Sequence, residues 1–349
     1  AKAYAAADPA ADGGVLDQRH DGSLNFADPA ALRLGLAKRV VWEGYLHIAV
    51  DGAHKFTVDS TAQLGIRLNG EAVKPGEITH LRVIGTIPKV QPHMNKPSIG
   101  VSSEDPAKFV LGNVPVEKDG SAYFVVPSGL SVFFQALGAD GRSFQTMRSL
   151  AYVQPQQTLG CVGCHEHRDL VPAPTKAMPI ALARPASLLE PAPEGTWPLR
   201  YDTLVQEVLD RRCVRCHTPE SKDPKADKTA KAFDLSPQRS FRTMMGYANG
   251  DLHNLSFEKP ESIVGDGVSR NSKLLALVTD ANKPHHGVKL TDEERERLIV
   301  WMDIYAPSAG AYSNQQEMDL LQFRIQMSHL LKSDQPAATQ PKTSVASQK

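Results

Sequence analysis

The four cysteines of this 349-residue chain form two Cys-x-x-Cys pairs, and a histidine directly follows each pair. The first motif contains Cys161, Cys164 and His165, and the second contains Cys213, Cys216 and His217. Two thiols three residues apart lie on nearly one side of a helical turn, so both can form thioethers to the vinyl groups of one porphyrin. The next histidine can then bind the iron as the proximal ligand. The pattern predicts two covalently bound haem c groups.

Other uses of paired cysteines fit less well. A zinc ribbon has two Cys-x-x-Cys pairs about 15–20 residues apart, and the gap between Cys164 and Cys213 is far longer. Neither thioredoxin-like redox pairs nor disulfides require a histidine directly after each pair. Zinc binding and disulfide formation therefore stay as alternatives to haem attachment.

The sixth ligand of each iron decides what a haem can do, because an open position permits chemistry whereas two protein ligands favour electron transfer. For the second haem the candidates are His285 and His286, and His285 is favoured because Gly287 gives the loop room to turn after it. For the first haem the candidate is His93, in a proline-rich loop. The first iron can also be five-coordinate.

Charge and hydropathy exclude some classes of function. The formal net charge is zero, which gives no electrostatic support for binding nucleic acid or a membrane surface. No apolar run approaches the ~18–20 residues of a transmembrane helix. The chain starts with Ala1 rather than Met, which we interpret as a processed or trimmed end. If haem is attached, the protein is expected in the periplasm or outside a bacterial cell.

The pattern of turns and apolar residues predicts a multi-domain α+β protein, with N-terminal antiparallel β modules before a mainly α-helical di-haem cytochrome c-like domain. Residues 1–80 are expected to form a partial β-sandwich module, with a hairpin around Asp51-Gly52. Residues 81–156 are expected to form an antiparallel, sandwich-like module, either one sheet or a small sandwich, with strands near 81–87, 110–116, 122–126 and 132–137.

Residues 157–312 are expected to form the di-haem domain. Its helices are predicted at Tyr201–Arg212, at Ser272–Val278 and after a capping box that starts at Thr291. Residues 313–349 should form a helix followed by a disordered tail, with Leu320 and Phe323 on the face that contacts the protein's own body.

The run WEGYLHIAVDGAHKFTVDSTAQLGIRLNGEAV, within residues 40–75, resembles part of a protective-antigen-type β-sandwich domain. Such domains often bind carbohydrate. The acidic positions that would hold calcium there are not evident, so the resemblance implies a structural β module here.

A second resemblance covers about residues 81–312. It is carried by LGNVPVEKDGSAYFVVPSGLSVFFQALGADGRSFQTMRSLAYVQPQQTLGCVGCHEHR, YDTLVQEVLDRRCVRCH, SRNSKLLALV and HHGVKLTDEERERLIVWMD, which are similar to the hydrazine synthase alpha subunit family. The resemblance implies two covalent haems in a helical domain attached to β modules. In that family a tyrosine four residues after the first motif's histidine ligates the iron, but Asp169 stands here, which leaves His165 free as an ordinary proximal ligand.

We therefore expect a di-haem c-type cytochrome that transfers electrons to and from redox partner proteins outside the cytoplasm, within a larger redox complex. One alternative is a haem enzyme of hydrazine synthase-like type, whose open first haem acts on a small nitrogen or oxygen species. Another is a docking or scaffold subunit of a redox complex. Catalysis needs an acid or base above the iron, and the sequence assigns none.

Overall fold

The computed structural model describes residues 2–4, 15–18, 39–41, 73, 76–89, 93, 96–103, 105–161, 178–257 and 264–332. The chain divides into two compact units, residues 1–65 and residues 66–349. In the first unit, β1 (Lys2–Tyr4) pairs antiparallel with β2 (Val15–Gln18) and β3 (Arg39–Val41). Apart from residues 40 and 41, which belong to β3, the predicted hairpin at residues 40–60 lies outside the described residues, as does most of the protective-antigen-like stretch.

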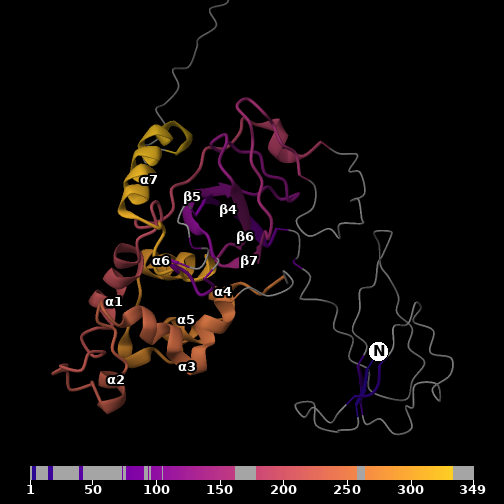
Figure 1. Cartoon of the computed structure of the whole chain (residues 1–349). Coiled ribbons are helices and arrows are strands. Elements are labelled where there is room, and N and C mark those ends of the chain that lie inside the picture. Colours follow the sequence, from indigo (N-terminus) through magenta and orange to yellow (C-terminus); the bar gives the residue numbers. More distant parts are fainter. Residues whose placement is uncertain are drawn as a thin grey trace, which may run out of the picture. The chain divides into compact units, whose positions relative to one another are not determined.

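The second unit is built on a four-stranded antiparallel sheet with strand order β5-β4-β6-β7 (Figure 1). The strands are β4 (Ile78–Ile87), β5 (Ala107–Pro115), β6 (Val132–Gly138) and β7 (Ser143–Thr146). Between β4 and β5 the register shifts after Val83, so that Val83 is opposite Gly112 and Ile84 is opposite Val110. Gly112 has a φ of +152°, and a Cβ there would lie 2.5 Å from the Glu190 carbonyl oxygen.

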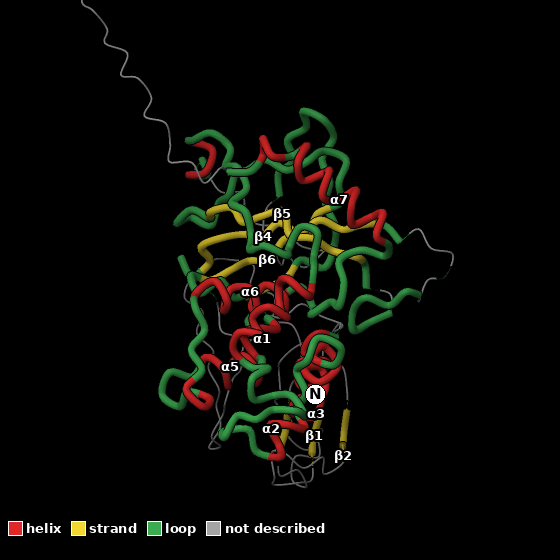
Figure 2. The backbone as a smooth tube through the Cα atoms, turned by 90° about the vertical axis from the view of Figure 1, so that its left-hand side faces the viewer, coloured by secondary structure: helices red, strands yellow, loops and turns green. Residues whose placement is uncertain are grey.

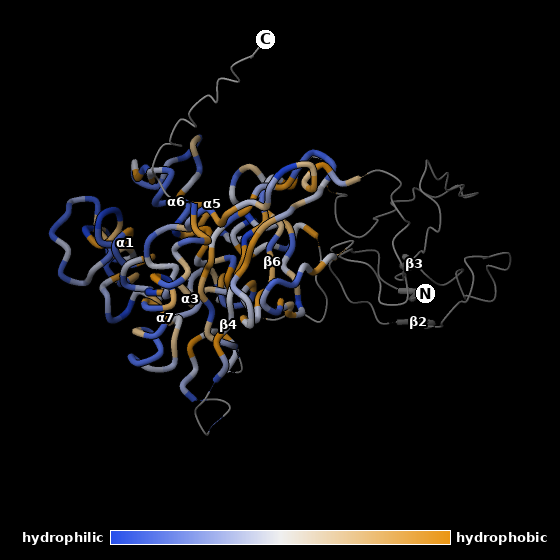
Figure 3. The backbone as a smooth tube through the Cα atoms, turned by 90° about the horizontal axis from the view of Figure 1, so that it is seen from above, coloured by the Kyte–Doolittle hydropathy of each residue, from blue (hydrophilic) through white to orange (hydrophobic). Residues whose placement is uncertain are grey.

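Both faces of this sheet are buried, and alternate residues of each strand contribute to the cores on opposite sides. Ile84 and Phe133 belong to one apolar core together with helical residues, whereas Val83 and Phe109 belong to a second core on the other face. Strands covered on both faces carry apolar residues on both sides, and Figure 3 shows hydrophobic stretches along β4 and β6.

The helical part follows the sheet in sequence. Its elements are η3 (Ile180–Ala183), the π-helical turn η4 (Asp202–Gln206), α1 (Glu207–Arg212), α2 (Lys228–Ala232), α3 (Ser240–Ser256), α4 (Val268–Asn271), α5 (Lys273–Thr279), η5 (His285–Gly287), α6 (Asp292–Asp303), α7 (Asn314–Gln326) and η6 (Ser328–Leu330). α3 is interrupted near its middle, where Ala248 and Asn249 have positive φ. In Figures 1 and 2, α6 lies against the sheet, with α1, α3 and α5 beyond it, whereas α7 lies on the opposite side.

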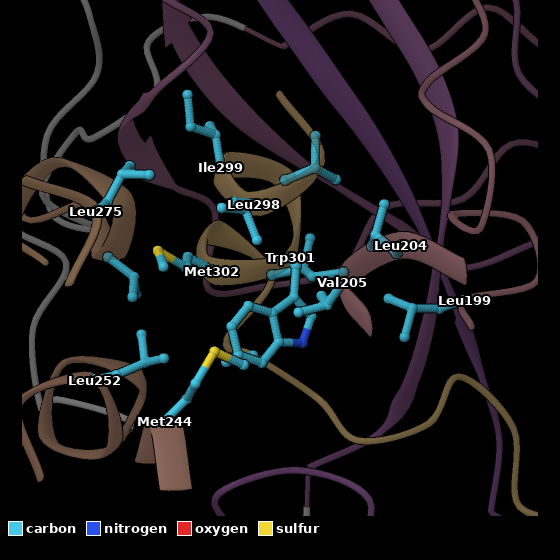
Figure 4. Close-up of a cluster of buried hydrophobic side chains, with 14 of the residues drawn as sticks. Leu199, Leu204, Val205, Met244, Leu252, Leu275, Leu298, Ile299, Trp301 and Met302 are labelled. Atoms are coloured by element: carbon cyan, nitrogen blue, oxygen red, sulfur yellow. The ribbon is translucent and has the colours of Figure 1, made fainter. Parts of the chain in front are cut away.

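Helix α6 joins the sheet to the other helices. It starts at a complete capping box, in which Thr291 accepts from the Glu294 amide and Glu294 accepts from the Thr291 amide. Its residues 297–303 are all buried, as expected of a helix packed on every side. Trp301 lies at the centre, beside Val205 and Met244 (Figure 4), and its indole N–H donates to the Pro307 carbonyl at 2.9 Å.

A buried polar network ties the end of α6 to the sheet. Gln135 accepts from Arg82 Nη1 at 2.9 Å and donates to the Asp303 carbonyl at 2.7 Å. The Asp303 carboxylate accepts from the backbone amides of Ser143 and Ser269, each at 2.9 Å, and lies 3.7 Å from Arg82. Burial raises the pKa of the Asp303 carboxyl, although Arg82 and the two amides act in the opposite direction.

The expected α+β class and the antiparallel arrangement are confirmed, but the sandwich is not. In the described part of residues 81–156 there is one sheet, and helices cover its faces where a sandwich would have a second sheet. The predicted strand at 122–126 is a loop whose Phe124 forms a single parallel bridge with Ser187. The predicted boundary at residue 80 falls inside β4, and the one at residue 156 falls inside the second compact unit. In the described part of the chain, no helix is long and apolar enough to cross a membrane.

Candidate functional site

The second motif begins where α1 ends. Buried Leu204, Val205 and Val208 hold η4 and α1 in the apolar core. Cys213 ends the helix, with its amide donating to the Leu209 carbonyl at 2.7 Å. The amides of residues 216 and 217 both donate to the Cys213 carbonyl at 3.0 Å. This tight turn presents the two thiols and the histidine of the motif to one place.

The His217 ring is held by its Nδ1 atom, which lies 3.1 Å from the Ala230 carbonyl oxygen of α2. A carbonyl can only accept, so Nδ1 carries the proton and Nε2 keeps its lone pair. Phe233 packs its ring against His217 in a T-shaped contact, with 5.5 Å between ring centres. A metal-binding histidine is commonly fixed in this way by a backbone carbonyl.

His285 lies opposite His217, on the loop before α6. The two ring centres are 6.0 Å apart, and the ring planes are within 20° of parallel. His285 is half-buried, whereas His286 is exposed and has a φ of +47°. Burial and the neighbouring His286 and His217 lower the pKa of His285, which keeps the imidazole neutral and its lone pair available.

A cavity of about 300 Å³ contains these groups. Its polar lining includes the two thiols and three histidines, and most of the rest is aliphatic or aromatic. The apolar lining residues are Val208, Leu209, Phe233, Leu235, Met244, Tyr247, Leu274, Leu277, Val278, Val288, Leu290, Leu298 and Met302. A concave apolar pocket with a few convergent polar groups is the usual form of a cofactor site.

The side chains present fit a haem better than the other uses of paired cysteines. Metal–imidazole bonds are about 2 Å long, so two histidines on opposite sides of one metal have ring centres roughly 6 Å apart, which is the spacing of His217 and His285. Cys213 and Cys216 form no disulfide, and burial raises the pKa of Cys213 to about 11, unlike a reactive redox thiol. Among the described residues, no three His, Cys, Asp or Glu side chains form a cluster that could hold a metal ion, so a zinc site is not supported.

An ion pair fixes the end of α1 next to the start of α6. Arg212 Nε donates to both carboxylate oxygens of Glu294, at 3.0 and 2.9 Å. Burial raises the pKa of Glu294, but the hydrogen bonds from Arg212 and the Thr291 amide outweigh burial and hold the pKa below its usual value. Because Arg212 precedes Cys213 and Glu294 follows the His285 loop, this pair holds the two sides of the cavity together.

The first motif is described in part. Cys161 is exposed, and Cys164 and His165 lie outside the described residues. His93 is exposed in the loop after β4. A second cavity, of about 310 Å³, lies between the sheet and α3, and none of the described motif residues lines it.

The structure thus brings five of the predicted site residues to one cavity: Cys213, Cys216, His217, His285 and His286. Sequence reasoning missed the Arg212–Glu294 ion pair, although the capping box had marked Glu294. It also missed the Ala230 carbonyl and the lining residue Lys225, for which the sequence carries no local signal.

Residues 76–166 match the hydrazine synthase alpha subunit middle domain. Among solved structures, a chain of Kuenenia stuttgartiensis hydrazine synthase is similar, with a TM-score of 0.50 and 18% identity over 70% of this chain. The match covers 40% of the hydrazine synthase chain, and no curated protein matches. Residues 76–166 are therefore hydrazine synthase alpha-like, and the chain shares the fold of part of a hydrazine synthase.

Proposed function

We propose that this chain is an electron-transfer protein that binds haem c at the second motif, with His217 and His285 as the two axial ligands. The observation that carries the proposal is the 6.0 Å separation of these two imidazoles across an apolar cavity that also contains Cys213 and Cys216. A haem iron with two histidine ligands supplies reversible one-electron transfer and has no free position for a substrate.

Each residue has a distinct task in this proposal. Cys213 and Cys216 attach the porphyrin, because their thiols lie on one turn beside the cavity. The Ala230 carbonyl orients His217 and makes it a stronger ligand, and burial keeps His285 neutral for binding. The apolar lining keeps water away, which limits the rearrangement of solvent when the charge of the site changes.

We extend the proposal to the first motif on the chemistry of its residues. Cys161 and Cys164 would attach a second haem c, with His165 as proximal ligand and His93 as a candidate on the other side. Two haems in one chain form a relay between redox partner proteins. Since haem c is attached outside the cytoplasm, we place the protein in the periplasm or outside the cell. The likeness to a hydrazine synthase supports a role as one subunit of a larger redox complex.

The first test is the haem content and spectrum of the full chain, produced in bacteria that attach haem c. Two haems per chain are expected in denatured protein, and replacing Cys213 and Cys216 by Ser should remove one of them. Protein without covalent haem would overturn the proposal.

The second test concerns the axial ligands. A low-spin paramagnetic resonance signal that carbon monoxide does not alter is expected for the second haem. His285→Ala should convert that signal to high spin and allow carbon monoxide to bind, whereas the matched His286→Ala should leave it unchanged. The reverse outcome would identify His286, rather than His285, as the second ligand. If the first haem binds carbon monoxide in the unaltered protein, the alternative of a haem enzyme applies to that haem.

A further inference from the structure

Two segments that contribute lining residues to the cavity of His217 and His285, residues 213–232 and 280–290, contain six lysines. We call Lys222, Lys225, Lys228, Lys231, Lys283 and Lys289 the lysine cluster. Lys225 lines the cavity, and its ammonium group donates to the His286 carbonyl at 3.5 Å. This contact brings the loop before α2 next to the η5 loop. Lys228 follows the lining residue Asp227, and Lys289 follows the lining residue Val288.

The acidic residues in these two segments are occupied by other groups. Asp223 pairs with Arg215, and Asp227 accepts from the Ala230 amide at the start of α2. Asp280 accepts from the amides of residues 282 and 283. Glu220 accepts from the Thr218 hydroxyl at 3.2 Å. Lys225 contributes to lowering the pKa of the Asp223 carboxyl, but among the described residues no ammonium group of the lysine cluster is within salt-bridge distance of a carboxylate. Five of the six lysine side chains are exposed.

The local charge differs from that of the whole chain. Residues 213–232 and 280–290 together carry seven Lys and Arg side chains and four Asp and Glu side chains, a net charge of +3, whereas the formal charge of the chain is zero. A positive surface of this kind attracts negatively charged partners and raises their rate of association.

The same surface has little apolar character. Among the described residues, the large exposed apolar side chains lie elsewhere, for example Met178, Phe257 and Ile325. Insertion into a membrane needs exposed apolar groups together with basic ones. A charged rim around a small apolar opening is instead suited to the small, transient interfaces of electron-transfer proteins.

We propose that the lysine cluster is the docking surface for a protein partner with an acidic surface. The identification of this partner as a redox protein rests on the proposed function, but the docking itself does not. The partner would contact the chain at the point where the cavity of His217 and His285 meets the surface.

The test uses the full haem-loaded chain and a fluorescent oligoglutamate peptide as the probe of an acidic surface. Binding is measured by fluorescence anisotropy at several salt concentrations. The double variant Lys225→Glu/Lys228→Glu should weaken binding by at least about tenfold, and the remaining binding should depend less on salt. Lys118→Glu is the matched control, since Lys118 is an exposed lysine in the turn after β5, and it should bind as the unaltered chain does. Circular dichroism of each variant checks that it is folded.

Three results would overturn the docking proposal: no binding by the unaltered chain, equal binding by the double variant, or an equal loss in Lys118→Glu. Tighter binding of phosphatidylglycerol vesicles or of single-stranded DNA than of the peptide, at the same salt concentration, would also overturn it and assign the surface to that other partner. Peptide binding by a chain that lacks haem would support the docking surface while refuting the proposed function.

A second measurement locates the surface relative to the redox site. Ferricyanide is an anion, so its rate of oxidising the reduced protein should fall in Lys225→Glu/Lys228→Glu, whereas the rate with a cationic cobalt phenanthroline complex should rise. Both rates should be unchanged in Lys118→Glu. Equal changes with both reagents would indicate a general structural effect and would count against the proposal.

Discussion

Loss of the buried network between Arg82 and Asp303 should destabilise the fold more than loss of the other polar contacts described above. Arg82 lies on β4 and Asp303 ends α6, and the two side chains are 1% and 0% exposed. Replacing Asp303 with Ala removes the carboxylate that faces Arg82 and that accepts from two backbone amides. We expect Asp303→Ala to reduce the free energy of unfolding substantially.

The size of this loss of stability follows from the groups that Asp303→Ala leaves without a partner. Removing one partner of a buried ion pair costs about 3–5 kcal/mol, because a charge stays buried without compensation. Two buried amides that lose their acceptor each cost about 1–3 kcal/mol. These costs are not additive, because water that enters the vacated space can hydrogen-bond to Arg82 and to the two amides. We therefore expect Asp303→Ala to lower the free energy of unfolding by about 4 kcal/mol in total. A domain whose free energy of unfolding is about 5–15 kcal/mol would stay folded after this change but lose a large part of its stability.

Arg82→Met tests the other side of the pair through its pH dependence. Without Arg82 the pKa of Asp303, already raised by burial, should rise further. An acid whose pKa is higher in the folded state stabilises the fold below its unfolded pKa of about 4, and this contribution is lost as pH rises through the folded pKa. Arg82→Met should therefore be less destabilising near pH 4 than at neutral pH.

The assay is urea unfolding followed by tryptophan fluorescence. Trp301 and Trp197 are buried in the cores on opposite faces of the sheet, so together they report on both. Asp292→Ala is the matched control on the same helix, because Asp292 pairs with Arg295 while 95% exposed, and it should have little effect. The double variant Arg82→Met/Asp303→Ala should cost about 1–3 kcal/mol less than the sum of the single variants. An additive double variant, or a loss under about 1 kcal/mol in Asp303→Ala, would refute the argument.

Three further predictions use the same assay. Glu294→Ala removes the capping box and the ion pair with Arg212, and it should lower the free energy of unfolding by about 2 kcal/mol. Because the pKa of Glu294 is lowered in the folded state, its contribution to stability is present above pH ~4.5 and is lost in acid. The stabilities of the variant and of the unaltered chain should therefore converge as the pH falls. Gly112→Ala should lower the free energy of unfolding by about 2–3 kcal/mol, because Gly112 has a positive φ and an added Cβ would meet the Glu190 carbonyl oxygen. Gly120→Ala should cost less, because Gly120 also has a positive φ but an added Cβ there would meet open space. Equal costs would contradict the steric explanation. Leu320→Ala, on the buried face of α7, should lower the free energy of unfolding by about 2–4 kcal/mol. Ile325→Ala should change it little, because Ile325 is 74% exposed. The reverse order of costs would mean that α7 packs on its other face.

The local parts of the fold could be predicted from the sequence because their causes lie within a few residues. The capping box at Thr291 is formed as expected, Ser272 caps α5, and the predicted helix at Tyr201–Arg212 is formed by η4 and α1. The apolar face of the predicted C-terminal helix packs against the core through Leu320. Each of these depends on side-chain periodicity or on a hydrogen bond across one turn.

The errors arose where a distant segment decides the structure. Residues 122–126 have the composition of a strand, but they form one bridge to a segment about 60 residues later and join no sheet. β7 was missed because Ser143 and Gln145 are polar, and the Ser143 amide is satisfied by Asp303 from the far end of α6. Of the two predicted arrangements, an antiparallel sheet and a small sandwich, the described residues form the single sheet; an apolar strand does not reveal whether a second sheet or a helix covers it.

The spacing of His217 and His285 is likewise a property of the fold rather than of either motif. His217 follows α1, whose C-terminal Arg212 binds Glu294 in the first turn of α6. His285 lies in the loop that leads into that same turn. Both imidazoles are thus positioned from the start of one buried helix, which the Asp303 network fixes to the sheet at its other end. For this reason the sequence could propose both histidines as ligands of one iron, but only the folded chain could bring their rings to a spacing that a single metal would bridge.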